Sequence, residues 1–213
     1  MYLLTATRNG VAAKELQRQL GVTYKCAWRI GHQLRILMSA RDKANTPDKL
    51  SGHVEIDETH VGGKTKTGKR RGPQLDKKTC VMGIVERGGA FKGHVVQDAK
   101  KTSLLPLVVQ HVAPGTMINT DTNAAYKTLK KLGYQHETLN HMQEEWARGI
   151  HHTNRIEGFW SHLKPGISST HVWVSRKHMQ KYVNEFAFRY NNRHQPAEMF
   201  ARLLAQVSKP TSY

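Results

Sequence analysis

Short apolar runs separated by polar turns predict a mixed β-sheet in the middle of this chain. Apolar and β-branched residues gather in four runs of strand length, and the sequence Arg-Gly-Gly-Ala is a hairpin turn between the second and the third. Two further segments have helical spacing. Three strands in a meander, then a helix, a strand and a helix, indicate an α/β domain with a mixed sheet flanked by helices. The predicted strands are residues 53–61, 79–86, 91–96 and 116–120, and the predicted helices are residues 102–112 and 122–132.

Residues 12–35 have the spacing of a helix-turn-helix. Leu16 and Leu20 give the first helix one apolar face, Gly21 suits the turn, and Thr23 is a good N-cap for the second helix. An ordinary helical hairpin is the alternative. In the DNA-binding interpretation, the second helix offers four side chains to a DNA groove: Tyr24, Lys25, Trp28 and Arg29.

Two more helices are predicted near the C-terminus. In residues 151–166 the apolar side chains recur at helical spacing, with a polar stripe beside them, and Pro165-Gly166 is expected to stop the helix. A long helix begins near Ser175 and is rich in Lys and Arg. The apolar set is Ile156, Phe159, Trp160 and Leu163, and the polar set is Glu157, Ser161 and Lys164.

The expected organisation is a small helix-turn-helix segment followed by one larger domain that contains the predicted sheet. Residues 42–52 are polar and contain Pro and Gly, so they are predicted to be a linker. Residues 64–78 form a basic loop, in which Lys69, Arg70 and Arg71 are expected to contact DNA phosphates. The predicted domains are residues 1–41 and 53–205, with a tail at 206–213.

The net charge of the chain indicates the kind of molecule that it binds. Lys and Arg number 33 against 16 Asp and Glu, which gives a net charge of +17 and favours a polyanionic partner such as nucleic acid. No apolar run has the length of a membrane span. Cys26 and Cys80 are far apart and predict neither a disulfide framework nor a zinc ribbon, so a reducing cytoplasm is expected.

Three acidic residues lie in elements that can converge on one point. Asp57 lies inside the first predicted strand, Asp121 ends a later strand, and Glu157 lies on a helix. Three carboxylates repel one another unless a cation lies between them, and oxygen ligands suit Mg²⁺ or Mn²⁺. Two such ions, about 3.5–4 Å apart, serve phosphodiester displacement. The sequence therefore predicts these acids as catalytic metal ligands, with two ions as cofactor.

Each acid also has an ordinary structural interpretation. Asp57 and Glu58 could be charges that protect an edge strand from aggregation. Asp121 could be the N-cap of the helix that follows it. Asn154 and Glu157 have the spacing of a capping box, in which the carboxylate serves only a backbone N–H group. From the residues alone, these alternatives stay open.

Four blocks of the chain resemble the ISXO-like insertion-sequence transposases, bacterial relatives of the eukaryotic Merlin elements. The resemblance runs from about residue 5 to about residue 205 and implies a DDE transposase with an RNase H-like core. It places the catalytic triad on Asp57, Asp121 and Glu157, and Lys164 matches a DNA-binding Lys found in many DDE enzymes. The blocks are VEIDETHVGGK, INTDTNAAY, HHTNRIEGFWSHLKPGI and KHMQKYVNEFAFRYNNR.

The same resemblance implies binding partners and two alternative functions. Double-stranded DNA, from the element's terminal repeats and from the target, is the expected partner, with homo-oligomers assembled on it in the bacterial nucleoid. Similar transposases begin with a Cys-paired zinc-binding segment that is not seen here, so we expect weak discrimination of terminal repeats. A related RNase H-like nuclease and a non-catalytic DNA-binding relic are the alternative functions.

Overall fold

The computed structural model describes residues 1–62, 78–139 and 153–207, and it divides the chain into two compact units. The boundary between Thr46 and Pro47 falls inside the predicted linker, residues 42–52. The first residues of that segment are nevertheless helical, because helix α3 continues to Asn45. The two units are Pro47–Ser161, and Met1–Thr46 together with His162–Tyr213. The predicted domains, 1–41 and 53–205, stay a prediction.

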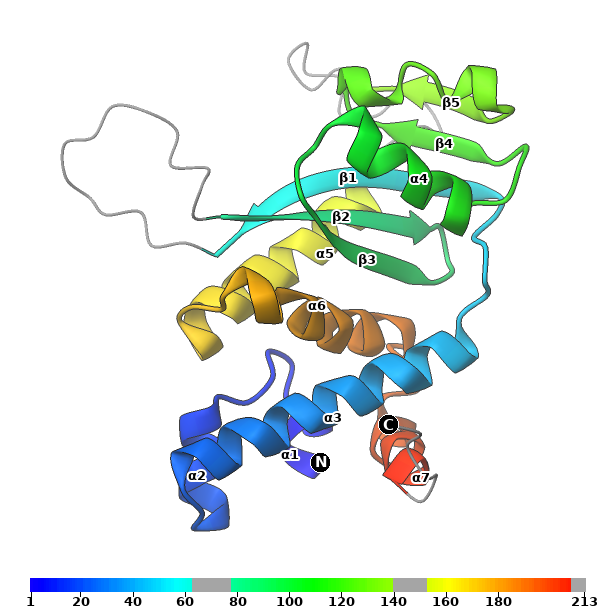
Figure 1. Cartoon of the computed structure of the whole chain (residues 1–213). Helices are drawn as coiled ribbons and strands as arrows, with labels where there is room; N and C mark the ends of the chain where they lie inside the picture. Colours follow the sequence, from blue (N-terminus) through cyan, green and yellow to red (C-terminus); the bar gives the residue numbers. More distant parts are fainter. Residues whose placement is uncertain (63–77, 140–152, 208–213) are drawn as a thin grey trace, which may run out of the picture. The chain divides into compact units, whose positions relative to one another are not determined.

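The unit Pro47–Ser161 is built on a five-stranded sheet with the order β3-β2-β1-β4-β5 (Figure 1). β1, β2 and β3 form an antiparallel meander, whereas β4 and β5 run parallel to β1. This order and these directions are those of an RNase H-like sheet, so the predicted α/β fold is confirmed. The strands are β1 His53–Val61, β2 Thr79–Glu86, β3 Phe91–Val96, β4 Met117–Thr120 and β5 Gln135–Thr138.

Helices cover both faces of this sheet (Figure 1). On one face Ile56 and Ile84 are fully buried in a core that also contains Leu104 and Val108 of helix α4, which is Lys101–His111. Helix α5, Asn154–Pro165, begins on the other face, where the Phe159 ring stacks on Phe91 with centroids 3.6 Å apart. The alternation of side chains in β1 therefore directs neighbouring residues to two different helical layers.

The helix predicted at residues 122–132 is wrong. The chain instead makes two short 3₁₀ helices, η2 (Ala124–Tyr126) and η3 (Lys130–Leu132), before β5, which the sequence pattern did not reveal. The Asn123 side chain accepts a hydrogen bond from Ala125 N, which starts a tight turn instead of a continuous helix. Ala125, Tyr126 and Leu129 of this stretch are buried in the core, whereas Leu132 is exposed.

The stop predicted at Pro165-Gly166 is also wrong. α5 continues into a π-helix, η5 (Gly166–His171). Pro removes one backbone donor, and a π-helical turn changes the pairing locally, so the chain continues past it. Gly166 is needed there because a Cβ atom would collide with the Phe186 ring.

The second unit is helical and contains the predicted helix-turn-helix. Gly21 takes a left-handed conformation with φ of 64°, and the Thr23 side chain caps α3 by accepting from Cys26 N. Both predicted helices are confirmed, although α3 is longer than expected. The helices are α1 Tyr2–Ala6, α2 Ala13–Leu20, α3 Tyr24–Asn45, α6 Arg176–Asn191, η6 Pro196–Glu198 and α7 Met199–Val207. In the part of the chain that is described, no helix is long and apolar enough to cross a membrane.

A buried carboxylate joins helices of this unit. Glu185 of α6 is fully buried and accepts from Arg35 Nε of α3 at 2.5 Å and from an Arg189 guanidinium nitrogen at 2.6 Å. Burial works to raise the pKa of Glu185, but the two guanidinium charges outweigh it and hold the pKa below its ordinary value. Removing one partner of such a pair leaves an uncompensated buried charge. The group Arg35–Glu185–Arg189 therefore stabilises the fold of this unit.

Candidate metal centre

Two aspartates lie side by side because β1 and β4 are parallel neighbours. In the register of these strands, Ile56 pairs with Thr120. Asp57 directly follows Ile56, and Asp121 directly follows Thr120, so the two aspartates lie next to each other on neighbouring strands. The sequence-based expectation that a strand interior and a strand end converge is therefore met for these two acids.

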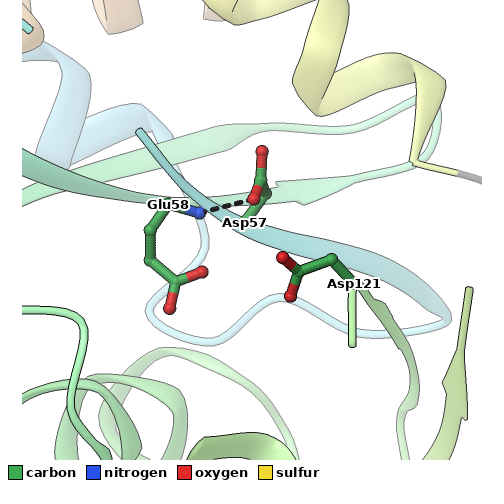
Figure 2. A group of neighbouring side chains, drawn as sticks. All are labelled: Asp57, Glu58 and Asp121. Atoms are coloured by element: carbon green, nitrogen blue, oxygen red, sulfur yellow. Dashed lines mark hydrogen bonds between the residues drawn. The ribbon is translucent and has the colours of Figure 1, made fainter. Parts of the chain in front are cut away.

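A third carboxylate completes a compact group at this point. Oxygen atoms of Asp57, Glu58 and Asp121 all lie within 4.8 Å of one another. Figure 2 shows Asp57 and Glu58 leaving opposite sides of β1, with the Asp121 side chain directed toward that strand. The edge-strand interpretation of Asp57 and Glu58 is wrong, because β1 is the central strand. The sequence analysis did not identify Glu58 as a site residue.

Both oxygens of Asp57 are held by hydrogen bonds. Oδ1 accepts from the backbone N–H of Glu58 at 2.8 Å, and Oδ2 accepts from the Trp160 indole N–H at 2.9 Å. Burial raises the pKa of Asp57 to about 6, and the charges of Asp121 and Glu157 add to the increase. The carboxylate is thus fixed in orientation but costly to ionise without a cation.

Glu58 lies in a separate polar environment on the α4 side of the sheet. Its Oε1 accepts from Asn123 Nδ2 at 3.1 Å. Burial raises the pKa of Glu58 to about 8, and the charges of Asp121 and Asp57 contribute. Burial, together with the Glu58 charge, also raises the pKa of Tyr126, so that this fully buried hydroxyl keeps its proton. Ionised Glu58 would therefore be stabilised by a nearby cation even more than ionised Asp57.

Asp121 is positioned by a turn and does not cap a helix. Its Oδ1 accepts from Asn123 N at 3.0 Å, two residues ahead, and Asn123 itself is the N-cap of η2. The N-cap interpretation of Asp121 is therefore wrong. Because the Asn123 side chain also donates to Glu58, one residue orients two members of the acidic group, Asp121 through its backbone N–H and Glu58 through its amide.

Glu55 explains why β1 contains yet another acid. This carboxylate is fully buried and accepts from the backbone N–H groups of Arg155 and Ile156 at 2.9 and 3.2 Å, and from Arg87 Nε at 2.8 Å. The two backbone donors belong to the first turn of α5, where N–H groups lack partners within the helix. A carboxylate at this position is also favoured by the helix dipole. Glu55 thus anchors the start of α5 on β1.

Glu157 lies in the first turn of α5, outside the compact group of described acids. Its Oε1 accepts from the Thr153 hydroxyl at 2.9 Å, and its backbone N–H bonds Thr153 O. Asn154 is already the first helical residue, so the Asn154–Glu157 pair does not form the expected capping box. The Glu157 side chain is exposed, and its charge raises the pKa of Asp57. Its assignment as the third catalytic acid stays a prediction.

Trp160 connects α5 to the sheet at Asp57 and at Gly83, the residue that pairs with Asp57. Gly83 of β2 pairs with Asp57 across the strands, and its lack of a side chain lets the indole ring lie against the backbone. A Cβ atom at Gly83 would be 2.8 Å from the Trp160 ring and 2.9 Å from Phe91. The glycine is therefore required for the indole to reach Asp57.

Gly83→Ala is expected to lower the free energy of unfolding by about 1–3 kcal/mol, because the added methyl group overpacks the interface between α5 and the sheet. Urea unfolding of the metal-free protein measures the change. Gly158→Ala is the matched control: it lies in α5 with no atom within 4 Å of the new Cβ, and should be neutral or stabilising. Equal stability of Gly83→Ala and wild type would contradict this account of the Trp160 contact.

The predicted DNA-contacting residues are only partly described. Lys25 and Arg29 are exposed on α3, and Lys164 is exposed on α5. The Trp28 ring is half-buried and stacks on His32 at 3.8 Å, so it packs within the helical unit. The remaining predicted contacts, Lys69, Arg70 and Arg71 of the basic loop, lie outside the described residues. The DNA-binding role of all these side chains stays a prediction.

The acidic group has the chemistry of a divalent cation site. All of its donors are carboxylate oxygens, which suit Mg²⁺ or Mn²⁺ better than softer metals. Among the residues that the structure describes, no Lys or Arg forms an ion pair with Asp57, Glu58 or Asp121. Burial and mutual repulsion raise the pKa of two of these acids, and a bound cation would remove that cost.

Several known proteins are similar to this chain. An uncharacterized transposase-like protein of Haemophilus influenzae is 29% identical over 98 residues, which are 46% of this chain and 78% of that protein. A pre-cleavage Mos1 transpososome structure matches with a TM-score of 0.38 and 12% identity, over 94% of this chain and 75% of that one. A simian T-cell lymphotropic virus intasome structure matches with a TM-score of 0.40 and 14% identity, over 67% of this chain and 49% of that one.

A family model also matches this chain. The model of the ISXO2-like transposase domain matches residues 49–191, about two thirds of the chain. This range includes β1 with Asp57 and Glu58, the end of β4 with Asp121, and α5 with Glu157. The resemblance to ISXO-like transposases is thereby confirmed, and the chain belongs to the ISXO2-like transposase family.

Proposed function

We propose that this chain is a metal-dependent DDE transposase, which cleaves DNA at the ends of an insertion sequence and joins those ends to target DNA. The observation that carries the proposal is the group of three carboxylates, Asp57, Glu58 and Asp121, with oxygens within 4.8 Å of one another. Membership of a transposase family supports it. The group occurs on the central strand and its parallel neighbour, where the rigid sheet holds it in place.

In this proposal Asp57 and Asp121 would hold the metal ions, and Glu58 would add a further carboxylate to the metal centre. Glu157 of α5 would be the third acid of the triad. When bound, Mg²⁺ or Mn²⁺ ions, two in our proposal, supply positive charge that activates the attacking oxygen and stabilises the leaving one. Trp160 and Asn123 orient the carboxylates through the hydrogen bonds described above. Glu55 keeps the first turn of α5, and with it Glu157, on the sheet.

The proposed reaction consists of two phosphodiester displacements. In the first, water attacks phosphorus, a new P–O bond forms, and the O3′ atom of the element leaves as a hydroxyl group after receiving a proton. In the second, that 3′-hydroxyl attacks a phosphodiester of the target, forms a P–O3′ bond and displaces the target's O3′ atom. One phosphodiester replaces another in the second step, so no external energy source is needed.

Exposed basic residues are the proposed DNA contacts. Lys25 and Arg29 of the helix-turn-helix would contact double-stranded terminal repeats, and Lys164 would contact a phosphate. Phosphate contacts of this kind account for a net charge of +17, because each one releases counterions from the DNA. Assembly of two or more copies on the DNA is part of the proposal.

The test is incubation of the full chain with a duplex that contains the terminal sequences flanking its own gene, together with a labelled target duplex. With Mg²⁺ or Mn²⁺, we expect nicks at the element ends and joined products in the target. A chelator should abolish both products. Nicks without joining would indicate the nuclease alternative, and binding without either product would indicate a DNA-binding relic.

A further inference from the structure

A strained turn with two exposed apolar side chains joins η5 to α6. Val172 has φ of 61° and ψ of −52°, and it is the only non-glycine residue with positive φ in the described parts of the chain. The backbone N–H of Trp173 bonds the carbonyl of His171 at 2.6 Å. These values define a classic γ-turn, which is rare and strained. A β-branched residue in this conformation is energetically unfavourable.

The last two residues of this turn, Val172 and Trp173, project from the protein although the residues on either side of them are anchored. Val172 is 65% exposed and Trp173 is 56% exposed. On one side the His171 ring packs on Tyr182, with centroids 4.7 Å apart, and on the other side Val174 is buried. The fold therefore holds a large indole ring in solvent on a rigid support. Stability does not explain this arrangement, since burial of the ring would be more favourable.

The surroundings of this turn are basic. The chain has no acidic residue between Glu157 and Glu185, whereas Lys164, Arg176 and Lys177 in this stretch are all exposed. Arg176 and Lys177 begin α6, whose first turn contains no acid and whose N-cap Ser175 makes no capping hydrogen bond. The positive end of the helix dipole is thus added to the side-chain charges. Such a surface favours a polyanion over an apolar protein partner or a second copy of this equally basic chain.

We propose that Val172 and Trp173 form a DNA-contacting tip, at which the Trp173 indole stacks on an unpaired base of the DNA substrate. An exposed aromatic ring among cations is the usual arrangement for binding unstacked bases, with the cations on the backbone phosphates. The rigid γ-turn lowers the entropy lost when the ring is ordered on a base. This inference rests on the proposed function, because it takes DNA as the substrate.

The test compares two DNAs in equilibrium binding with the full chain. One is a short labelled duplex with a single unpaired base, and the other is the same duplex fully paired. Wild type should prefer the unpaired base, and Trp173→Ala should reduce that preference by about 5- to 150-fold, since stacking on one base contributes about 1–3 kcal/mol. Trp173→Phe should retain most of it. With 2-aminopurine as the unpaired base, wild type should quench its fluorescence and Trp173→Ala should not.

Tyr2→Ala is the matched control, because Tyr2 is also a highly exposed aromatic residue but lies in no basic stretch. Its preference should equal that of wild type. The proposal is overturned if wild type has no preference for the unpaired base, or if Trp173→Ala weakens both DNAs equally. A change of oligomeric state in Trp173→Ala without an effect on DNA would identify a protein contact instead. Binding is measured with a chelator, so a failure of cleavage does not affect this outcome.

Discussion

Asp57→Asn is expected to reduce strand cleavage by at least about 10²–10³-fold, the loss typical of removing one preorganised electrostatic group from an active site. The amide keeps the shape of the side chain, and its oxygen can still accept from Trp160. Its NH2 group then replaces the oxygen that accepts from the Glu58 N–H, so one hydrogen bond is lost but the fold should be retained. It removes the negative charge that would hold a cation between β1 and β4. DNA affinity in the presence of a chelator should change less than about 2-fold, because the basic surfaces are untouched. Gel assays of nicked product, run beside anisotropy titrations, measure both quantities.

Asp98→Asn is the matched control for this substitution. Asp98 lies in the same unit, is half-buried and accepts from Ser103 at 2.7 Å, but it is not part of the acidic group. Its cleavage rate should remain near that of wild type. Full activity of Asp57→Asn would refute the assignment of the metal centre, whereas equal losses of binding and cleavage would place Asp57 in DNA binding instead of catalysis.

The central part of the sheet could be predicted from the sequence because its signals are local. The strands at 79–86 and 91–96 and the hairpin turn between them were predicted to the residue, since β-branched runs and a Gly-Gly turn specify them without distant contacts. The placement of Asp57 and Asp121 followed from element type alone. Parallel pairing of β1 with β4 then brings them together.

The remaining acids could not be assigned in this way, because their roles depend on residues far away in the chain. Glu55 serves the first turn of α5, about one hundred positions later. Glu58 faces the opposite side of β1 from Asp57, and alternation alone would exclude it from the same site. It joins the group only because Asp121 and the Asn123 turn approach β1 from the neighbouring strand end. A signal was present in the sequence: a strand with consecutive acids, Asp57 and Glu58, was itself unusual.

Two errors in the predicted helices have a common physical origin. Helical spacing in residues 122–132 reflects burial against α4, which two short 3₁₀ turns achieve as well as one helix. Pro165 in the sequence predicts a stop, but the packing of Gly166 on Phe186 stabilises a continued helical path. In both cases tertiary packing overrides a local preference. For the buried Glu185, the partner Arg189 lies four residues later in the same helix, whereas Arg35 becomes a partner only when α3 packs on α6.

Glu58→Gln is expected to stabilise the metal-free protein at about pH 8, by about 2 kcal/mol in the free energy of unfolding. Burial raises the pKa of Glu58 from its ordinary 4.5 to about 8, so the folded state holds a proton that the unfolded chain has released. Stability therefore falls as pH rises through this window. The full shift would correspond to about 4–5 kcal/mol, and partial exposure of the carboxylate reduces the expected effect. Glutamine has no proton to lose and removes the dependence.

The window between about pH 6.5 and about pH 8 isolates this effect. Below it Asp57, whose pKa burial raises to about 6, titrates with the same sign as Glu58. His32 and His171, whose pKa burial lowers to about 4, act in the opposite direction, because the unfolded chain takes up their protons first as pH falls below 6.5. Urea unfolding of wild type and Glu58→Gln at the two ends of the window therefore compares one group.

Mg²⁺ should reverse the pH trend in wild type, because a bound cation stabilises the ionised carboxylates that are costly in its absence. The gain in unfolding free energy at saturating Mg²⁺ should be larger at about pH 8 than at about pH 6.5, and it should shrink in Glu58→Gln. Glu137→Gln is the control, since Glu137 is a partly exposed acid on the edge strand β5 and lies outside the acidic group. If Glu58→Gln has the same stability as wild type at both pH values and the same gain from Mg²⁺, Glu58 does not belong to the metal centre, and Asp57, Asp121 and Glu157 alone would remain as the proposed ligands.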